Sequence, residues 1–265
     1  MIRVGVIGAY GRMGREVCRA VASDPECSLV AAVDVSGCGE NIGPLIGHSE
    51  MNLLVSDELD ALTDSEVDVA VDFTHPDAVM DDIRWCVRHA VHLVVGTTGL
   101  SSANLDEIRA LIEEEGSESN VFVAPNFAIG AVLMMWFAAA ASRWLPAAEI
   151  IELHHDGKAD APSGTAMKTA EEIAKARSAG GEAKASKEVA AGARGGEVAG
   201  IHVHSVRLPG LVAHQEVILG GPGQSLTIRH DSYDRASFMP GVLLAVKAIT
   251  KHPGLTYGLE KILEL

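Results

Sequence analysis

Two histidines and a lysine stand close together in the segment ELHHDGKADAPSGTA, which covers residues 152–166. Histidine can give or take a proton near neutral pH, and a cationic lysine can bind a carboxylate or lower the pKa of a neighbour. The set His154, His155 and Lys158 therefore suits acid catalysis on an anionic substrate. An exposed strand end followed by an ordinary helix start would give the same pattern, so these residues alone leave both interpretations open.

The residues after the lysine predict the start of a helix. Ser163 can cap a helix that begins at Gly164 and Thr165, and the backbone N–H groups of these two residues are then available to a carboxylate. The preceding run AEIIELHH predicts a strand, in which neighbouring side chains point to opposite faces. We therefore expect one histidine to face the site and the other to support it from the side.

A second candidate site lies near the N-terminus, where Gly8, Gly11 and Gly14 form a G-x-x-G-x-x-G array between a predicted strand and a predicted helix. Glycine allows a tight turn and a close approach to a pyrophosphate, which the N–H groups at a helix N-terminus bind. Asp34 ends the second predicted strand, where an acidic residue accepts hydrogen bonds from a ribose. The spacing differs from the commoner GxGxxG, and an ordinary turn is the alternative, but the flanking strand and helix favour a dinucleotide site.

The charges near Asp34 bear on the choice of cofactor. No lysine or arginine occurs between Arg19 and Arg84, and Asp34 itself would repel a 2′-phosphate. We therefore expect NADH to be used at least as well as NADPH, unless Arg12 or Arg15 reaches the phosphate from the glycine loop.

The elements that must position these residues follow two patterns. Residues 1–127 alternate short apolar strands with helices, which predicts a Rossmann-type, doubly wound parallel sheet in an α/β domain. Residues 128–235 hold strands that follow one another with few helices, which predicts a second α+β domain with a mostly antiparallel or mixed sheet. The tail 236–265 is expected to be helical and to return to the first domain. The Ala- and Gly-rich stretch 178–200 is expected to be a mobile loop.

Composition limits the classes of partner. The chain has 265 residues and a formal charge of −15 at pH 7, which argues against nonspecific binding to nucleic acid or to an anionic membrane. Its four cysteines lack metal-ligand spacing and are expected to be free thiols in a reducing cytoplasm. The apolar run 128–141 is too short to span a membrane. His202 and His204 share a predicted strand face without an evident third ligand, so no metal is expected.

Taken in order, the motifs resemble one family, the dihydrodipicolinate reductases (4-hydroxy-tetrahydrodipicolinate reductases) of bacterial lysine biosynthesis. The resemblance spans nearly the whole chain and rests on GAYGRMG, DFTHP, GTTG, APNFAIG, ELHHDGKADAPSGTA and GIHVHSVRLPG with HQEVILGGPGQSLTIRHDS. It implies a reductase that passes hydride from a nicotinamide cofactor to a cyclic, unsaturated dicarboxylate and yields tetrahydrodipicolinate. It also implies a homotetramer built through the sheet of the second domain.

The resemblance assigns roles to particular residues. His154 would be the proton donor and Lys158 its partner, while His155 and the amides of Gly164 and Thr165 would hold the substrate carboxylates. The residues that would line the cofactor are Gly8, Ala9, Tyr10, Gly11, Arg12, Met13, Asp34, Gly96, Thr97, Thr98, Ala124, Pro125, Asn126 and Phe127.

One departure from the family pattern agrees with the charge argument. Some members carry a basic residue directly after the acidic one, whereas Val35 follows Asp34 in this sequence. Two alternatives to the reductase remain at this point. One is another two-domain dehydrogenase, acting for example on homoserine or aspartate, and the other is a noncatalytic protein that senses NAD.

Overall fold

The computed structural model describes residues 1–177 and 187–265 and divides the chain into two compact units. The first unit comprises Met1–Phe127 and Phe238–Leu265, and the second comprises Ala128–Ser237. The domains expected from the sequence are 1–127 with 236–265 and 128–235.

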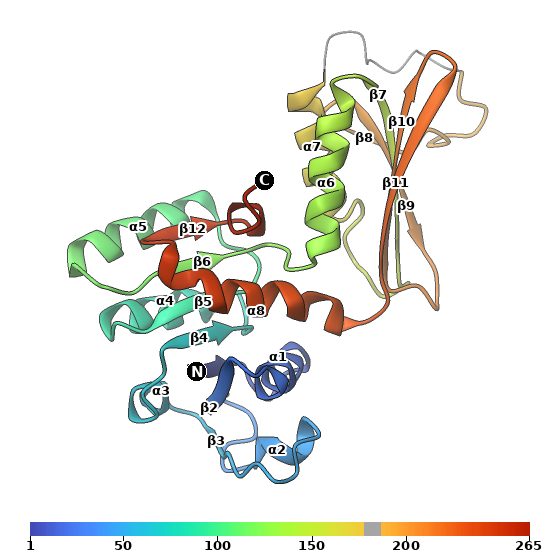
Figure 1. Ribbon diagram of the computed structural model, residues 1–265. Coiled ribbons are helices and arrows are strands. Elements are labelled where there is room, and N and C mark those ends of the chain that lie inside the picture. The colour runs from blue at the N-terminus through green and yellow to red at the C-terminus, as the bar shows by residue number, and fades with distance from the viewer. Residues whose placement is uncertain (178–186) are drawn as a thin grey trace. The chain divides into compact units, whose positions relative to one another are not determined.

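Within the described residues, the first unit has a seven-stranded parallel sheet in the order β12-β6-β5-β4-β1-β2-β3 (Figure 1). Both neighbours of β1 are parallel to it, and the strand order reverses there, which is where open α/β sheets bind ligands. The predicted Rossmann-type sheet is confirmed. The strands are β1 (Ile2–Ile7), β2 (Cys27–Val33), β3 (Val55–Ser56), β4 (Val69–Asp72), β5 (His92–Val95), β6 (Val121–Val123) and β12 (Leu255–Tyr257).

The first helix of this unit presents an apolar face to the sheet. In the first helix, Gly14, Val17, Cys18 and Val21 are buried at helical spacing, so one face of the helix packs inward. The last helix packs against the first. The helices of the unit are α1 (Arg12–Ser23), α2 (Ile42–Leu45), α3 (Asp60–Asp64), α4 (Val79–Arg88), α5 (Ser102–Glu115) and α8 (Met239–Ala248).

The prediction of a wholly helical tail was wrong at Leu255–Tyr257, which form β12 beside β6. Pro253 and Gly254 stop the helical run, because proline cannot continue a helix and Gly254 has a φ of 74°. The carbonyl of Gly254 then accepts a hydrogen bond from the N–H of Val121, which starts the pairing with β6. The helix α8 belongs to the first unit.

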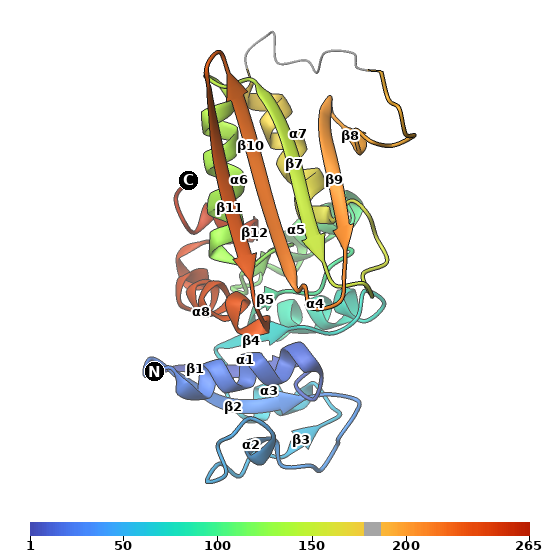
Figure 2. The ribbon, with the colours of Figure 1, turned by 90° about the vertical axis from the view of Figure 1, so that its right-hand side faces the viewer.

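The described part of the second unit has a five-stranded sheet in the order β11-β10-β7-β9-β8, in which only β7 and β9 pair in parallel. Figures 1 and 2 show that both helices of the unit cover the same face of this sheet. Buried Ile150, Val203 and Val217 point to that face. The elements are α6 (Ile129–Ser142), β7 (Ala147–His154), α7 (Gly164–Ala176), β8 (Gly196–Val198), β9 (Ile201–Arg207), β10 (Ala213–Gly221) and β11 (Gln224–Ser232).

The first part of the predicted mobile loop 178–200, residues 178–186, lies outside the described residues. Its end was predicted wrongly, since Gly196–Val198 form β8 and pair antiparallel with β9. The turn between the two strands consists of Ala199 and Gly200, both with positive φ (51° and 76°), as a tight hairpin requires.

Candidate active site

The first unit holds a pocket of about 300 Å³ at the carboxyl ends of β1, β2 and β4. This is the position at which the strand order reverses. Of the predicted cofactor residues, the pocket brings together Gly8, Gly11 and Asp34. Its lining residues are Ile7, Gly8, Gly11, Val33, Asp34, Val35, Asp57, Leu59, Phe73, Thr74, His75, Ala78 and Asp82.

The glycine loop beside this pocket has the geometry that a pyrophosphate requires. Gly8 has a φ of 78°, and a Cβ there would lie 2.5 Å from the carbonyl oxygen of Phe73. A Cβ at Gly14 would overlap the carbonyl oxygen of Gly8, so only glycine lets the first turn of α1 pack against the loop. Gly11 caps α1 without a side-chain hydrogen bond, which leaves the helix N-terminus accessible to a ligand. These residues fit a dinucleotide.

Asp34 organises the region where the ribose would lie. Its Oδ2 accepts a hydrogen bond from the N–H of Tyr10 at 2.9 Å, and its Oδ1 accepts one from the N–H of Ser36 at 2.8 Å. The guanidinium of Arg15 lies 4.3 Å above the centre of the Tyr10 ring. Val35 is 90% exposed, so its side chain contributes little to packing.

The other predicted residues of the glycine loop differ in exposure. Ala9 is fully buried, whereas Arg12 is exposed and Met13 is partly buried. The position of Ala9 makes it a packing residue of the loop.

The loop after β5 rests on a buried polar group. The hydroxyl of Thr97 donates to Oδ1 of Asp72 at 2.6 Å, and Gly96 leaves room for the ring of Phe73. Thr98 is exposed. Thr97 therefore supports the loop through Asp72, and the sequence did not single out this carboxylate.

The loop after β6 is partly buried by aromatic packing. The ring of Phe127 lies 6.0 Å from those of Phe73 and Phe122. Ala124 is buried, Pro125 is exposed and Asn126 is partly exposed. The loops after β5 and β6 follow the carboxyl ends of their strands, but they do not contribute to the described lining of the 300 Å³ pocket.

In the second unit, His154 ends β7 on the helix-covered face of the sheet. Its Nδ1 lies 2.5 Å from Oε2 of Glu152, whose side chain is fully buried. Burial lowers the pKa of His154 below its usual value, and the positive charges of Lys158 and Arg207 lower it further, while Glu152 acts in the opposite direction. The neutral form of His154 is therefore favoured, and its protonated form is a stronger acid than an ordinary imidazolium.

His155 and Lys158 lie beyond the end of the strand. His155 is exposed, and Lys158 is partly buried with its Nζ 2.7 and 2.9 Å from the two carboxylate oxygens of Asp160. The alternation of strand side chains does not extend to His155, because β7 ends one residue earlier.

The predicted helix start is confirmed at α7. Oγ of Ser163 accepts a hydrogen bond from the N–H of Ala166 at 3.2 Å, which is a normal N-cap. A side chain at Gly164 would meet nothing within 4 Å, so there is open space at the first turn. The N–H of Ser163 donates to Oε1 of Glu152 at 3.3 Å, so the carboxylate that contacts His154 also contacts the start of α7.

Two residues of this region escaped the sequence analysis. Glu152 lies two positions before His154 and so shares its strand face, and Arg207 lies opposite His154 on β9. The guanidinium of Arg207 contacts both carboxylate oxygens of Glu152, at 2.8 and 2.9 Å. Period-two spacing in β7 was a signal for Glu152, whereas the position of Arg207 depends on the pairing of strands distant in the sequence.

Potential metal ligands do not gather in the part of the chain that the structure describes. The described residues contain no group of three potential metal ligands, and Nε2 of His204 lies 2.8 Å from Oε2 of Glu149. None of the helices in the described ranges is long and apolar enough to cross a membrane.

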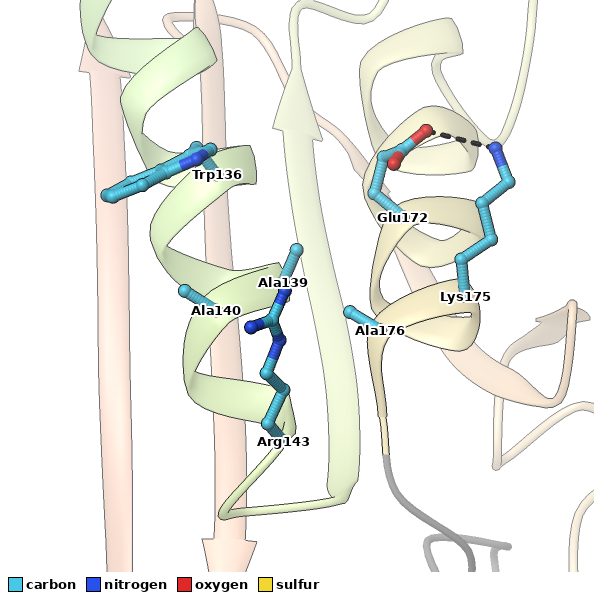
Figure 3. A pocket seen from close by; sticks show the side chains of 7 residues that line it. All are labelled: Trp136, Ala139, Ala140, Arg143, Glu172, Lys175 and Ala176. Atoms are coloured by element: carbon cyan, nitrogen blue, oxygen red, sulfur yellow. Dashed lines mark hydrogen bonds and ion pairs between the residues drawn. The ribbon is translucent and has the colours of Figure 1, made fainter. Parts of the chain in front are cut away.

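A further cavity of about 380 Å³ lies between α6 and α7 (Figure 3). Trp136 lines it from α6 and Arg143 from the residue after α6, while Glu172 and Lys175 form an ion pair on the α7 side. None of the predicted site residues belongs to its described lining.

The first unit has a parallel sheet with a glycine loop and an acidic strand end, and the second unit has a histidine and a lysine. Together these features define a two-domain nucleotide-dependent oxidoreductase. Comparison with known proteins makes the assignment specific. The family model for the N-terminus of dihydrodipicolinate reductase matches residues 2–127, and the family model for its C-terminus matches residues 130–263. The chain belongs to the dihydrodipicolinate reductase family, and the predicted reductase activity is confirmed at this level.

Relatives match along the whole chain. A 4-hydroxy-tetrahydrodipicolinate reductase of Syntrophomonas wolfei is 49% identical over 98% of both chains. That of Nocardia farcinica is 49% identical over 100% of this chain and 99% of its own. A dipicolinate-bound dihydrodipicolinate reductase from Paenisporosarcina sp. TG-14 superposes with a TM-score of 0.84 at 42% identity, covering 99% of both chains.

Proposed function

We propose that the chain reduces a cyclic, unsaturated dicarboxylate with a nicotinamide cofactor and yields tetrahydrodipicolinate for the synthesis of diaminopimelate and lysine. The observation that carries the proposal is the convergence of His154 and the capped start of α7 on a single buried carboxylate, Glu152, with the charge of Lys158 acting on His154. The relative from Paenisporosarcina binds dipicolinate, a ring with two carboxylates, which supports a substrate of this class.

The substrate carboxylates would bind to groups at the end of β7 and the start of α7. The amides of Gly164 and Thr165 lie in the first turn of a 13-residue helix, where the helix dipole favours an anion. Lys158 is held by Asp160 in an ion pair, which a substrate carboxylate can replace. His155 is exposed beside these groups in the sequence and would contribute a further hydrogen bond.

His154 would supply the proton. Its Nδ1 faces Glu152, so Nε2 is the nitrogen that is left to exchange a proton with the substrate. The charge of Lys158 lowers the pKa of His154 and so makes its protonated form a stronger acid.

The cofactor would be held by the glycine loop, Asp34 and the loops after β5 and β6. When bound, it supplies the hydride. Gly8 to Met13 would approach the pyrophosphate, Asp34 the ribose, and Gly96–Thr98 with Ala124–Phe127 the nicotinamide side.

The chemistry of the second unit is tested by His154→Gln and Lys158→Ala. Loss of general acid catalysis should lower kcat by about 10²- to 10⁴-fold in His154→Gln, and loss of the cation in Lys158→Ala should lower kcat and raise KM for the dicarboxylate. The assay generates the substrate from pyruvate and aspartate semialdehyde and follows NADH absorbance. Cofactor affinity, measured by fluorescence titration, should stay nearly unchanged because Asp34 and the glycine loop are intact. Wild-type turnover in either variant would remove that residue from the mechanism.

The choice of cofactor is tested by kinetics with both nucleotides. The described lining of the pocket contains Asp34 and Asp57 but no lysine or arginine, so we expect NADH to be used at least as well as NADPH. The variant Val35→Arg should lower KM for NADPH by roughly tenfold, since an exposed guanidinium there can pair with a 2′-phosphate. Val35→Gln is the matched control without the charge. A hundredfold preference of the wild type for NADPH would contradict the proposal and would indicate that Arg12 or Arg15 reaches the 2′-phosphate.

We also propose a homotetramer and a cytoplasmic location. The helices of the second unit cover one face of its sheet, and no described helix of that unit covers the other (Figure 2). Ile151, Leu153 and Ile218 are partly buried on that second face and could pack against another copy. All four cysteines are free, which suits a reducing compartment.

A further inference from the structure

Glu152 is a fully buried carboxylate that contacts the predicted proton donor and the predicted anion site together. It lies on β7 with His154, on the face covered by α7. We propose that Glu152 is the positioning residue of the reaction, which keeps a hydrogen on Nδ1 of His154 so that Nε2 delivers the proton. This inference rests on the proposed role of His154 as the donor.

The contacts of Glu152 occupy both of its oxygens. Oε2 lies 2.5 Å from Nδ1 of His154 and accepts a hydrogen bond from Nη1 of Arg207 at 2.9 Å. Oε1 accepts hydrogen bonds from Nη2 of Arg207 at 2.8 Å and from the N–H of Ser163 at 3.3 Å. The carboxylate thus sets the orientation of the imidazole relative to the first turn of α7, because both are attached to it.

An ionised carboxylate can only accept hydrogen bonds, and this determines the tautomer of the histidine. Burial raises the pKa of Glu152, but hydrogen bonds from Arg207, Ser205 and His154 outweigh it and hold the pKa below its usual value. Glu152 is therefore ionised at neutral pH, and neutral His154 must carry its hydrogen on Nδ1. In the reaction, the imidazolium breaks its Nε2–H bond, the substrate gains that proton, and His154 returns to the Nδ1–H form.

The charges that face His154 predict the effect of removing Glu152. Burial, Lys158 and Arg207 lower the pKa of His154, and Glu152 is the group that raises it. Asp160 pairs with Lys158, and its backbone carbonyl accepts from Arg207. Neutralising Glu152 leaves two cations beside His154, so the pKa of His154 should fall and less of the donor form should exist at a given pH.

The same strand offers a matched control. Glu149 also contacts a histidine and an arginine, namely His204 and Arg194, but it lies on the opposite face of the sheet and is 35% exposed. Glu149→Gln makes the same chemical change three residues away without touching His154 or the start of α7.

The first experiment compares Glu152→Gln with Glu149→Gln. We expect Glu152→Gln to lower kcat by roughly 10- to 100-fold with a smaller change in KM for NADH, and to shift the limb of the kcat–pH profile assigned to His154 to lower pH. Glu149→Gln, shown by gel filtration to have the same oligomeric state as the wild type, should leave kcat and the profile unchanged. Unchanged kcat and an unchanged pH profile in folded Glu152→Gln, or an equal loss in Glu149→Gln, would overturn the positioning role.

The second experiment needs no substitution of Glu152, so it holds even if that variant does not fold. ¹⁵N NMR of the wild-type protein near pH 8, with the His154 signals assigned by their absence in His154→Gln, reports which ring nitrogen carries the hydrogen. The Nδ1–H form is expected, and the Nε2–H form would overturn the inference. If His154→Gln kept wild-type turnover while His154 showed the Nδ1–H form, the proposed function of His154 would fail and the contact with Glu152 would be structural only.

Discussion

Glu152 in the second unit and Asp82 in the first are both buried carboxyl groups beside a predicted site, but the charges around them differ. Glu152 contacts the guanidinium of Arg207, and its pKa is held below the usual value in spite of burial. The acidic group with the largest effect on Asp82 is Asp72, which is also buried. Burial and this second carboxylate raise the pKa of Asp82 to about 7.

The difference shows that burial alone does not determine the protonation state of a carboxyl group. Desolvation disfavours the charged form at both positions, and the neighbour decides the outcome. A guanidinium keeps Glu152 charged and able to orient His154. Around Asp82, Thr74 offers only a hydroxyl, at 3.4 Å, and the charge of Asp72 disfavours ionisation, so the protonated form of Asp82 is favoured.

The largest expected change in the free energy of unfolding follows from removing the cation beside Glu152. Arg207→Ala leaves a fully buried carboxylate without its main partner and should destabilise the protein by about 3–5 kcal/mol. Arg194→Ala breaks the ion pair with Glu149, whose side chain is 35% exposed, and should cost less than about 1 kcal/mol. Urea unfolding at pH 7 and equal protein concentration measures both. Equal losses in the two variants would remove the distinction between the two faces of β7.

The pH dependence of that stability has a definite sign. Because the pKa of Glu152 is lowered in the folded protein, its contribution is present above the ordinary pKa of a glutamate and is lost as the pH falls through the folded value. In Arg207→Ala this contribution should be smaller. The free energies of unfolding of the variant and the wild type should therefore differ more at pH 7 than at acidic pH.

The sequence predicted those parts of the fold and site that depend on local patterns. Continuous apolar runs predicted the buried parallel strands, and Ser163 was predicted as the cap of α7 because a serine before a helical run is a local signal. The glycine array predicted the loop at Gly8 because its strand and helix neighbours are adjacent in the chain.

What the sequence missed depends on pairing between distant strands. Arg207 meets Glu152 only because β9 pairs with β7 in one register, and the two residues are 55 positions apart. In the same way, Thr97 reaches Asp72 only through the pairing of β4 with β5. The short strand β12 was missed because three residues after a Pro-Gly pair carry too little periodicity to predict a strand.

A smaller change in the free energy of unfolding, of opposite sign, is expected in the first unit from Asp82→Asn. Because the pKa of Asp82 is raised from 3.8 to about 7, the folded protein binds more protons there than the unfolded chain between these values. Stability from this group therefore falls as the pH rises from about 4 to about 7 and stays low above that range. An asparagine is neutral at every pH and can donate to Asp72 as a protonated Asp82 would, so Asp82→Asn should be more stable than the wild type at pH 8.

We expect a gain on the order of 1–2 kcal/mol at pH 8 that disappears near pH 4, measured by thermal or urea unfolding across the pH range. Asp81→Asn is the control, since Asp81 is the preceding residue of α4, its side chain is 81% exposed, and it pairs with Arg84 at the surface. That variant should lose a few tenths of a kcal/mol at neutral pH and show no gain at pH 8. A loss of stability in Asp82→Asn at pH 8 would mean that the ionised carboxylate is the favoured form, and that the two units treat their buried carboxyl groups alike.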